Sequence, residues 1–552
     1  MSLTVTHAKV SAIADDPAAS AAGEVLPSDW NAAHIVTGAM SVFNVADFGA
    51  VGNGVSDDTT EIQAALDAAN AAGGGVVWVP PGTYKISNSL IVYSNTHVRG
   101  AGRGATTLRG TAGAYSGKTI NGGSSIYCTI AMTSASRSSV KSLTVDHSTN
   151  STTANGIAIL FDGTETPSNM CVIEDCEVLG YDSHQYLIWN YMGVGSKIIN
   201  NYIDGGVTSR DGTVGQEGIE SYGGVDVLIS GNTIKNINQY GIYLWGDTDS
   251  GPPTNVTISN NYLSVCHSGI RVVANAYNIR VFGNHCDDCW ETGIKVTCSS
   301  TTTLDDVGVF ANTVDTADVG IYLRSESGGT TSRVLVDGNS VNNTDSTTDA
   351  GIYVYSFSKF NVYNNTIKHS SGHGIYFEEC SYARACNNII DTVEKIGIYC
   401  YDVSKAQILG NEILEYNNGS GGDPGIQITA SDNILMDHNS FKWTHGSYTI
   451  NVTSSASDRC IVGKGNQLLQ NSYANPTYRN SGTNPNRGTV SLSAAATTTT
   501  VYNTLVNPSS QISINQTAGT IKAFIVNNVG HGSFDLVTAA AAGDETFAYE
   551  IA

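Results

Sequence analysis

A glycine-isoleucine pair recurs along most of the chain, and this repeat constrains the fold more than any other feature. The pairs begin at Gly156, Gly218, Gly241, Gly269, Gly293, Gly320, Gly351, Gly374, Gly397 and Gly425. A second repeat consists of asparagines, namely Asn201, Asn232, Asn261, Asn284, Asn312, Asn339, Asn365, Asn388, Asn411, Asn439 and Asn466. Their steps of about 23 to 31 residues lie in the range where self-similarity indicates a solenoid or a propeller.

Between these markers the sequence is typical of short strands joined by turns. Apolar runs such as 227–229 and 241–245 are separated by corners rich in glycine, asparagine and serine. One unit of two or three such strands cannot bury its apolar side chains, but stacked units form a continuous core. We therefore predict an all-β fold, a parallel β-helix. The leucine spacing of horseshoe repeats is absent, and propeller blades need longer repeats.

In such a coil the recurring asparagines would lie above one another at the strand spacing of about 4.8 Å. Their side-chain amides would then form a hydrogen-bonded ladder at one corner. Asparagine also tolerates left-handed backbone, so we expect these residues to supply that conformation at the corner.

The charge and the apolar pattern exclude several classes of protein. Lys and Arg number 27 against 49 Asp and Glu, and the net charge of −22 argues against a general binder of nucleic acid or anionic membranes. A run of about twenty apolar residues is absent, so we expect no membrane insertion. The start, Met1–Val5, lacks the charged and apolar parts of a secretory signal, so we expect a soluble chain not exported by that route.

The chain has 11 cysteines, an odd and scattered set. In a protein made in a reducing cytosol they are best interpreted as small buried apolar residues. His285, Cys286 and Cys289 have metal-like spacing, but no second pair of ligands lies nearby in the sequence. We predict no metal site and no cofactor.

An amphipathic helix is expected ahead of the repeats. Asp58 and Glu61 form a capping-box pattern, and the apolar residues that follow share one helical face. These are Ile62, Ala65, Leu66 and Ala69. Glycines at 73–75 end the helix, and placed there it would cover the open apolar end of the stack.

Residues 47–59, Asp-Phe-Gly-Ala-Val-Gly-Asn-Gly-Val-Ser-Asp-Asp-Thr, closely resemble the amino-terminal motif of the pectate-lyase-like β-helix superfamily, which includes bacteriophage tailspike depolymerases. Only Asn53 and Ser56 depart from the more usual Asp and Thr. With the repeats, the resemblance covers about residues 43–470 and implies a right-handed parallel β-helix. It implies less about chemistry, because the superfamily contains lyases, hydrolases, isomerases and inert adhesins.

Both ends of the chain resemble parts of phage tail proteins. Residues 26–34 resemble short leaders that attach a fibre to the virion, and the Thr/Val/Ile-rich end through 543–551 resembles a small closing β domain. The resemblance implies a homotrimer located in the virion tail, although coiled-coil heptads are absent. The expected division is 1–40 for attachment to phage tail or baseplate proteins, 41–100 for the capping helix and first strands, 101–472 for the β-helix with its substrate-binding face, 473–486 for a linker, and 487–552 for a carboxy-terminal β domain serving trimerisation or sugar binding.

In each strand opened by a Gly-Ile pair, an inward isoleucine places the next residue, and the one two further on, outward. These outward positions are rich in aromatic and charged residues, which suit sugar rings, hydroxyls and carboxylates. The predicted polysaccharide-binding residues are Tyr243, Trp245, Arg271, Lys295, Tyr322, Arg324, Tyr353, Tyr355, Tyr376, Tyr399 and Tyr401. The alternative is that this face packs between chains of a trimer, although its charge favours binding.

Hydrolysis of a glycosidic bond needs two carboxyl groups, roughly 5 Å or 6.5–9.5 Å apart. The predicted catalytic residues are Glu220 and Glu378, which occupy outward strand positions, and Asp247 and Asp249, which follow Trp245. Further acids near the face are Glu326, Glu379 and Asp402. A lyase would instead need a base beside an acidic sugar whose carboxylate is neutralised, a role open to Arg271 and Lys295.

We therefore expect a phage tailspike that binds and cleaves a bacterial surface polysaccharide, whether capsule, exopolysaccharide or O-antigen. An endo-acting glycoside hydrolase is the first expectation. The alternatives are a polysaccharide lyase and a non-catalytic receptor-binding or structural fibre.

Overall fold

The computed structural model describes most of the repeat region and several short flanking strands. The described residues are 4–5, 34–35, 41–111, 119–120, 124–125, 127–148, 156–163, 167–181, 186–207, 212, 215–246, 251–273, 275–299, 302–326, 329–346, 350–416, 423–444, 450–453, 460–462, 466–468, 478–480, 487–491, 498–502, 512–518, 524–527, 533–538 and 546–551. The chain divides into two compact units. Unit 1 comprises residues 1–207 and 214–233, and unit 2 comprises 208–213 and 234–552.

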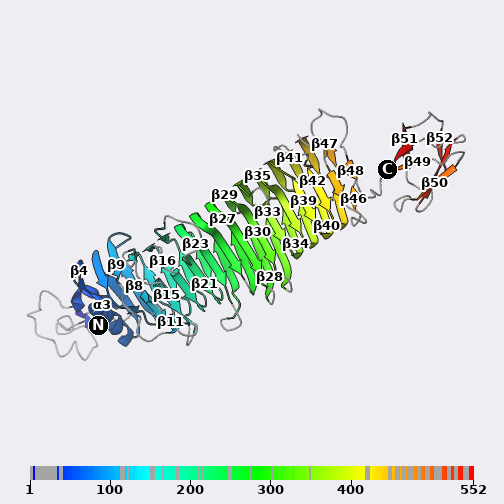
Figure 1. Cartoon of the computed structure of the whole chain (residues 1–552). Helices are drawn as coiled ribbons and strands as arrows, with labels where there is room; N and C mark the ends of the chain where they lie inside the picture. The colour runs from blue at the N-terminus through cyan, green and yellow to red at the C-terminus, as the bar shows by residue number, and fades with distance from the viewer. Residues whose placement is uncertain are drawn as a thin grey trace, which may run out of the picture. The chain divides into compact units, whose positions relative to one another are not determined.

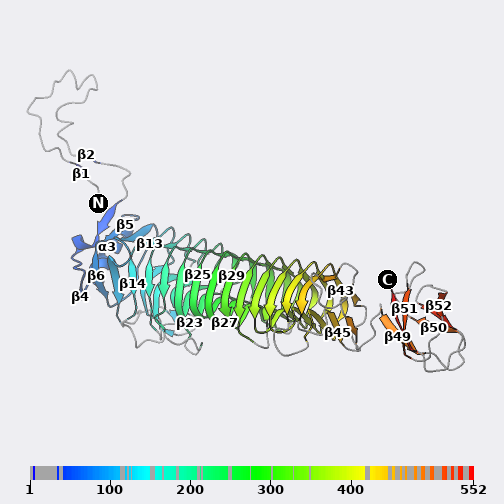
Figure 2. The same ribbon diagram turned by 90° about the horizontal axis from the view of Figure 1, so that it is seen from above.

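Unit 1 is a stack of parallel strands (Figures 1 and 2). Its strands are β3 (Val42–Asn44), β4 (Asn53–Asp57), β5 (Gly75–Val79), β6 (Gly82–Ile86), β7 (Leu90–Ile91), β8 (Thr96–Gly100), β9 (Thr106–Gly110), β12 (Tyr127–Thr133), β13 (Ser139–Lys141), β14 (Thr144–Asp146), β15 (Gly156–Asp162), β16 (Val172–Glu174), β17 (Glu177–Leu179), β18 (Tyr186–Tyr191), β19 (Lys197–Ile199), β20 (Tyr202–Asp204), β21 (Glu217–Tyr222) and β22 (Leu228–Ser230). They form three parallel columns, β3-β5-β8-β13-β16-β19-β22, β4-β6-β9-β14-β17-β20 and β7-β12-β15-β18-β21.

The expected helix is present in unit 1 as α3 (Thr59–Ala71), after the 3-10 helix η1 (Val45–Phe48). Its four predicted apolar residues are buried, and α3 contacts β3, β5 and β7. The capping box was a wrong prediction. Asp58 makes no side-chain cap, because its carboxylate accepts hydrogen bonds from the N–H groups of Val51 at 2.6 Å and Gly52 at 3.3 Å. The acid therefore holds the loop before the helix.

Unit 2 repeats the same architecture. Its strands are β23 (Thr233–Trp245), whose first residue belongs to unit 1, β24 (Thr254–Ser259), β25 (Tyr262–Val273), β26 (Ala276–Phe282), β27 (His285–Cys298), β28 (Thr303–Phe310), β29 (Thr313–Ala317), β30 (Val319–Ser325), β31 (Thr330–Asp337), β32 (Ser340–Thr344), β33 (Ala350–Tyr355), β34 (Ser358–Tyr363), β35 (Thr366–Ser370), β36 (His373–Glu378), β37 (Ser381–Cys386), β38 (Ile389–Val393), β39 (Ile398–Tyr401), β40 (Ser404–Leu409), β41 (Glu412–Tyr416), β42 (Ile426–Thr429), β43 (Asp432–Asp437), β44 (Ser440–Thr444), β45 (Ile450–Thr453), β46 (Ile461–Val462), β47 (Gln467–Leu468) and β48 (Tyr478–Asn480).

Three columns of unit 2 matter for function. We call them first, second and third, in the order in which the chain passes through them in each turn. The first column runs β24-β26-β28-β31-β34-β37-β40-β43-β46. The second runs β29-β32-β35-β38-β41-β44-β47, and the third runs β30-β33-β36-β39-β42-β45-β48. β27 is long enough to pair with both β29 and β30. Both units are thus all-β parallel β-solenoids, which confirms this part of the predicted fold.

The core of each solenoid follows the predicted alternation. In β33 the inward residues are Ile352 and Val354, and in β36 they are Ile375 and Phe377, all with no exposed surface. The pair glycines from Gly241 to Gly397 are needed for close approach between rungs. A Cβ on Gly397 would lie 2.6 Å from the carbonyl oxygen of Gly425, which is too close for any larger residue.

The asparagine ladder is present, with one correction. Asn339 donates from its backbone N–H and its Nδ2 to Oδ1 of Asn365, both at 2.9 Å, and its Nδ2 also donates to the carbonyl of Val309 at 3.0 Å. The same pattern recurs rung by rung, and the asparagines are buried. The left-handed backbone lies one residue earlier, at positions such as Gly338 and Asn364. The ladder asparagines themselves therefore serve hydrogen bonding, not the left-handed turn.

Strands outside the solenoid turns are antiparallel. Toward the carboxyl end, β49 (Arg487–Ser491), β54 (Thr546–Ile551) and β51 (Ile512–Ala518) form one sheet, and β50 (Thr498–Tyr502), β53 (Ser533–Thr538) and β52 (Phe524–Asn527) form another. Two further short strand pairs are antiparallel, β1 (Thr4–Val5) with β2 (His34–Ile35) and β10 (Thr119–Ile120) with β11 (Ser124–Ser125). Most of 1–40 and of the 473–486 linker lie outside the described residues. Among the residues that are described, no helix is long and apolar enough to cross a membrane.

Replacing Asn339 with alanine tests the ladder. Asn339→Ala removes the acceptor of Asn312 N–H and Nδ2 and the donor to the Val309 carbonyl, so buried polar groups lose their partners. We expect the free energy of unfolding to fall by about 3 kcal/mol, measured by urea denaturation. Asn342→Ala on the same turn is the control. Its amide bonds Asp315 at a half-buried position, and its loss should cost about 1 kcal/mol or less. Equal losses in the two variants would contradict the ladder's importance.

Candidate functional site

Four tyrosines form a stack on the outer side of the third column of unit 2. Tyr322, Tyr353, Tyr376 and Tyr399 each follow a buried isoleucine and are paired in register. Neighbouring ring centroids lie 4.8–4.9 Å apart, with planes inclined by 6–11°. The predicted outward orientation of these residues is confirmed, and we call this set the tyrosine ladder.

The stacking changes how the ladder would meet a sugar. The inner rings have both faces against other tyrosines, and the ring of Tyr322 also has the ammonium of Lys295 5.4 Å from its centroid. A sugar therefore cannot lie flat on the inner rings. The half-buried ladder instead presents ring edges and phenolic hydroxyls, which are hydrogen-bonding groups at the rung spacing of about 4.8 Å.

Glu378 lies within this ladder. Its carboxylate accepts a short hydrogen bond from the hydroxyl of Tyr353. Burial, followed by this hydrogen bond and the charge of Glu378, raises the pKa of Tyr353. The pKa of Tyr376 is also raised, first by burial and then by the charge of Glu378. Both tyrosines remain protonated donors, and Glu378 is held as their acceptor.

A second outward row lies beside the ladder. The guanidinium of Arg324 lies 6.0 Å from the ring centroid of Tyr355, and Tyr401 lies beside Tyr399 with centroids 6.3 Å apart. The pKa of Tyr355 is raised first by a hydrogen bond with Glu379 and then by the negative charge of Glu379. Arg324 and Tyr401 are exposed, so this row is the solvent-facing edge of the predicted binding surface.

The cationic part of the face is organised around Arg271. Its guanidinium lies 4.6 Å from the ring centroid of Tyr240 and 5.8 Å from that of Tyr243, and it donates a short hydrogen bond to the Tyr240 hydroxyl. Tyr243 in turn stacks on Trp245, with centroids 6.3 Å apart and planes at 9°. Arg271, on β25, thus contacts aromatic residues of the neighbouring strand β23.

Lys295 differs from the prediction, because it is only 9 % exposed and already paired. Its ammonium lies 2.6 Å from Glu291, whose carboxylate also accepts from Ser268 Oγ at 2.8 Å and lies 3.7 Å from His267 Nδ1. Burial acts to raise the pKa of Glu291, but the hydrogen bond and charge of Lys295, with Ser268 and His267, lower it overall. Lys295 therefore organises this cluster and is less available to a ligand.

On several turns the residue before the Gly-Ile pair also borders the face, and the sequence reasoning missed this position. His373 is an example, with ring centroids 5.4 Å from Tyr376 and 5.2 Å from Tyr399. It is 7 % exposed, and burial, with a smaller contribution from the charge of Lys395, lowers its pKa to about 3. Tyr240 and Glu217 occupy the same position on other turns. Their constant offset from the glycine was a signal that could have found them.

Unit 1 contains a pair of buried acids on β21. Glu220 is 2 % exposed and Glu217 is 5 % exposed. Burial, followed by the charge of Glu217, raises the pKa of Glu220 well above its usual range. Oε2 of Glu220 is buried and makes no hydrogen bond within the described residues. Glu220 was predicted to face outward into solvent. Neighbouring side chains cover it instead.

Aromatic side chains border this pair. Trp189 on β18 is in register with Glu220, and Tyr191 is in register with Tyr222. Trp189 stacks on Tyr186 at 4.6 Å, and Tyr191 stacks on Tyr222 at 5.2 Å. Burial against such rings favours the neutral form of a carboxyl group. A proton donor has to be in this neutral form near neutral pH.

Two predicted catalytic residues and one pair of cysteines remain to be placed. Asp247 and Asp249 lie outside the described residues. Cys286 and Cys289 are buried free thiols, and hydrogen bonding between them, then burial, raises the pKa of Cys286. Protonated thiols are poor metal ligands, and no cluster able to hold a metal occurs in the part of the chain that the structure describes.

Two family models match parts of the chain. Residues 42–295 match the model described as rhamnogalacturonase A/epimerase, pectate lyase-like, and residues 225–420 match that of the periplasmic copper-binding protein NosD. The description of the first model agrees with the resemblance of residues 47–59 to the pectate-lyase-like proteins, and the match lies within the region of parallel strands.

Curated relatives match a short segment at high identity. Over 74 residues the chain is 53% identical to mannuronan C5-epimerase AlgE1 of Azotobacter vinelandii and 49% identical to alginate lyase 7 of the same organism. The segment is 12% of this chain in both cases, and 5% and 9% of those proteins respectively. The chain thus matches only a small fraction of the length of these relatives.

Two solved structures match the chain at low sequence identity. The A-module of Azotobacter vinelandii AlgE6 has 16% identity and a TM-score of 0.38, covering 78% of this chain and 100% of the module. A mutant tailspike protein of E. coli bacteriophage HK620, in complex with a pentasaccharide, has 11% identity and a TM-score of 0.49, covering 92% of each chain. These values are too low to support an argument about chemistry.

The raised pKa of Glu220 predicts a pH-dependent effect on stability. The folded protein keeps a proton that the unfolded chain loses above a pKa of about 4.5. The free energy of unfolding therefore falls as the pH rises from about 4.5 through the pKa of Glu220 in the folded protein. Glu220→Gln cannot ionise. We expect it to match the wild type near pH 4 and to be more stable at about pH 8, by about 1 kcal/mol or more.

Thermal midpoints measured across this pH range would check the effect. Glu394→Gln, at an exposed turn, is the control and should show no growing advantage with pH. A Glu220→Gln variant that is equally or less stable at high pH would contradict the buried, protonated state of this acid.

Proposed function

We propose that the chain is a tailspike-type protein that binds and cleaves a bacterial surface polysaccharide as an endo-acting glycoside hydrolase. The observation that carries the proposal is the buried acid Glu220 beside Glu217 and an aromatic wall. Glycosidases use one carboxylic acid with a raised pKa and one carboxylate. Glu220 is suited to the first role and Glu217 to the second.

In this mechanism Glu220 donates its proton to the glycosidic oxygen as the bond to the leaving sugar breaks. Glu217 either attacks the sugar or activates water, according to the separation of the two groups in the complex. Because Glu220 is almost fully buried, productive binding requires the side chains around it to move. The low polarity around it keeps the donor protonated until the sugar arrives.

The tyrosine ladder supports polysaccharide as the ligand. It offers a row of protonated phenols with Arg324 and Arg271 on the same outward side of the strands, and such groups bind sugar hydroxyls and carboxylates. The matched proteins include a rhamnogalacturonase family, mannuronan epimerases and an alginate lyase, whose names refer to polysaccharides.

A second candidate is a polysaccharide lyase, and one observation favours it. Arg271 is hydrogen-bonded to the hydroxyl of Tyr240, beside Tyr243. An elimination needs a cation for the sugar carboxylate and a base for the neighbouring proton, roles that Arg271 and Tyr240 match. The alginate lyase among the relatives agrees with this alternative.

The assembly is also part of the proposal. Residues 1–40 would attach the protein to phage tail or baseplate proteins, and 487–552 would serve trimerisation or sugar binding, so the protein would act as a homotrimer in the virion tail. The resemblance of both ends to phage tail proteins supports this, as does the antiparallel β-structure of residues 487–551. Light scattering on the purified full chain would give a mass about three times that of one chain. A monomer would contradict this part.

Incubating the protein with capsule and O-antigen preparations, alginate and polygalacturonate separates the candidates. A hydrolase releases new reducing ends without unsaturated sugars, and a lyase releases unsaturated ends with ultraviolet absorbance. Intact polymer with retained binding indicates a fibre without activity. Glu220→Gln should lower cleavage by about a hundredfold or more while sparing binding. Glu378→Gln, which removes a ladder acceptor, should have a smaller effect. Full activity in Glu220→Gln would remove the assignment.

The ladder makes a separate prediction about binding. Tyr376→Phe keeps the stacked ring and loses the hydroxyl, so polysaccharide binding should weaken about fivefold with no change in thermal midpoint. Affinity electrophoresis would measure it. Tyr277→Phe on β26, in the first column, is the matched control. If Tyr376→Phe binds as the wild type does while Tyr376→Ala unfolds, the ladder is only structural.

A further inference from the structure

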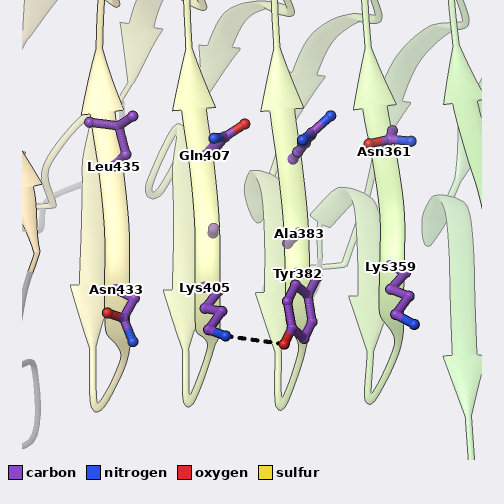
Figure 3. A pocket seen from close by; sticks show the side chains of 10 residues that line it. Lys359, Asn361, Tyr382, Ala383, Lys405, Gln407, Asn433 and Leu435 are labelled. Atoms are coloured by element: carbon purple, nitrogen blue, oxygen red, sulfur yellow. Dashed lines mark hydrogen bonds between the residues drawn. The ribbon is translucent and has the colours of Figure 1, made fainter.

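A groove lies on the first column of unit 2. The tyrosine ladder lies on a different column, the third. The groove has a volume of about 550 Å³ and is formed by strands β34, β37, β40 and β43 (Figure 3). Its polar lining includes Lys359, Tyr382, Arg384, Lys405, Gln407 and Asn433. Three of these side chains are cations, and the lining contains no carboxylate.

This charge is unusual for the chain and for the column. The whole protein has a net charge of −22. On earlier turns of the same column, Arg280 is paired with Asp306 and Arg333 with Asp305, each at 2.9 Å. Within the described residues, Lys359, Arg384 and Lys405 have no carboxylate within ion-pair distance. The nearest comparable cations are thus neutralised, and those of the groove are not.

Residues with left-handed backbone place several of these side chains along one edge of the column. Lys359, Tyr382, Lys405 and Asn433 have φ of 59°, 55°, 64° and 57°, one residue on each turn. The conformation continues on earlier turns, at Asp306 and others, so it belongs to the column as a whole. What distinguishes the groove is the choice of side chains at these positions.

The spacing suits an extended anionic chain. Lys359 and Lys405 lie two rungs apart, about 10 Å at the usual strand spacing. Between them Tyr382 is 51 % exposed, and its hydroxyl accepts a hydrogen bond from Lys405 Nζ at 3.1 Å (Figure 3). Figure 3 shows Lys359, Tyr382, Lys405 and Asn433 in a row across four strands, with Asn361 and Gln407 in a parallel row. Positive charge therefore repeats along the stack beside amides that bind hydroxyls.

We propose that this groove is an auxiliary, non-catalytic site for a carboxylate-bearing polysaccharide, held by Lys359, Arg384 and Lys405. The choice of polysaccharide as the ligand rests on the proposed function, but the site is separate from the acids assigned to cleavage. Binding here would hold a long polymer on the protein between cleavage events. Since no carboxyl group lines the groove, it lacks the pair of acids that glycosidic hydrolysis needs.

The test compares the full-length Lys359→Asn/Lys405→Asn variant with the wild type. Asparagine tolerates the left-handed backbone and already occupies this row at Asn433, so the fold should be retained. The control is Lys197→Asn/Lys368→Asn, which removes the same charge from β19 and β35, outside the groove. The probes are alginate and polygalacturonate as polyuronates and dextran as a neutral polymer.

We expect the groove variant to bind the polyuronates about tenfold or more weakly, with a smaller dependence on salt, and the control to bind as the wild type does. Dextran binding should not change in either variant. Equal polyuronate binding by the wild type and both variants would overturn the proposal. A change of mass in light scattering, with polyuronate binding intact, would also overturn it by showing that the groove is a contact between copies.

Cleavage measured in parallel keeps this proposal distinct from the proposed function. Glu220→Gln should lose cleavage and keep groove binding, and the groove variant should still cleave short oligosaccharides at the wild-type rate. A wild type that binds polyuronates through Lys359 and Lys405 but cleaves no polymer would refute the hydrolase and leave the groove supported.

Discussion

Stacking of identical positions at the strand spacing is the constraint on which the rest of this structure depends. The ladder of buried asparagines makes the stack specific, because each amide bonds both the next asparagine and a carbonyl on the preceding turn. A slip of one residue would break these bonds and turn apolar side chains outward. Once the register is set, any outward residue type that recurs in the repeat becomes a column. The tyrosine ladder and the row of Lys359, Tyr382 and Lys405 are both products of that rule.

The fold could be predicted from the sequence because two features recur with each turn. These are the glycine and asparagine marker residues and the alternation of inward and outward residues in the strands. The outward direction of Tyr322, Tyr353, Tyr376 and Tyr399 followed from one glycine-isoleucine phase. The sequence did not predict how buried each outward residue is, because a residue that faces away from the core can still be covered by other side chains. Glu220 and Lys295 were both expected at the surface and both are buried. Their environment depends on side chains from neighbouring turns, which no local pattern reveals.

The same limit applies to pairing between side chains that a straight extended strand would hold far apart. Glu291 lies four residues before Lys295 but was not associated with it, since β27 passes from the second column to the third near these residues and the two side chains meet there. The unpaired cations of the first column were missed for a related reason. Whether Arg384 or Arg333 has an acidic neighbour is decided by residues about one turn away, so charge in a solenoid has to be assessed across rungs.

The burial of the cysteines has a consequence for how motion of the fold can be measured. All eleven are thiols outside any disulfide, and ten are buried. Burial raises the pKa of Cys128, Cys176 and Cys380 to about 12, so the reactive thiolate is almost absent at neutral pH. Oxidants and alkylating reagents can therefore reach these sulfurs only when a rung opens. The chain consequently contains built-in chemical probes whose labelling rates would report local breathing along each unit.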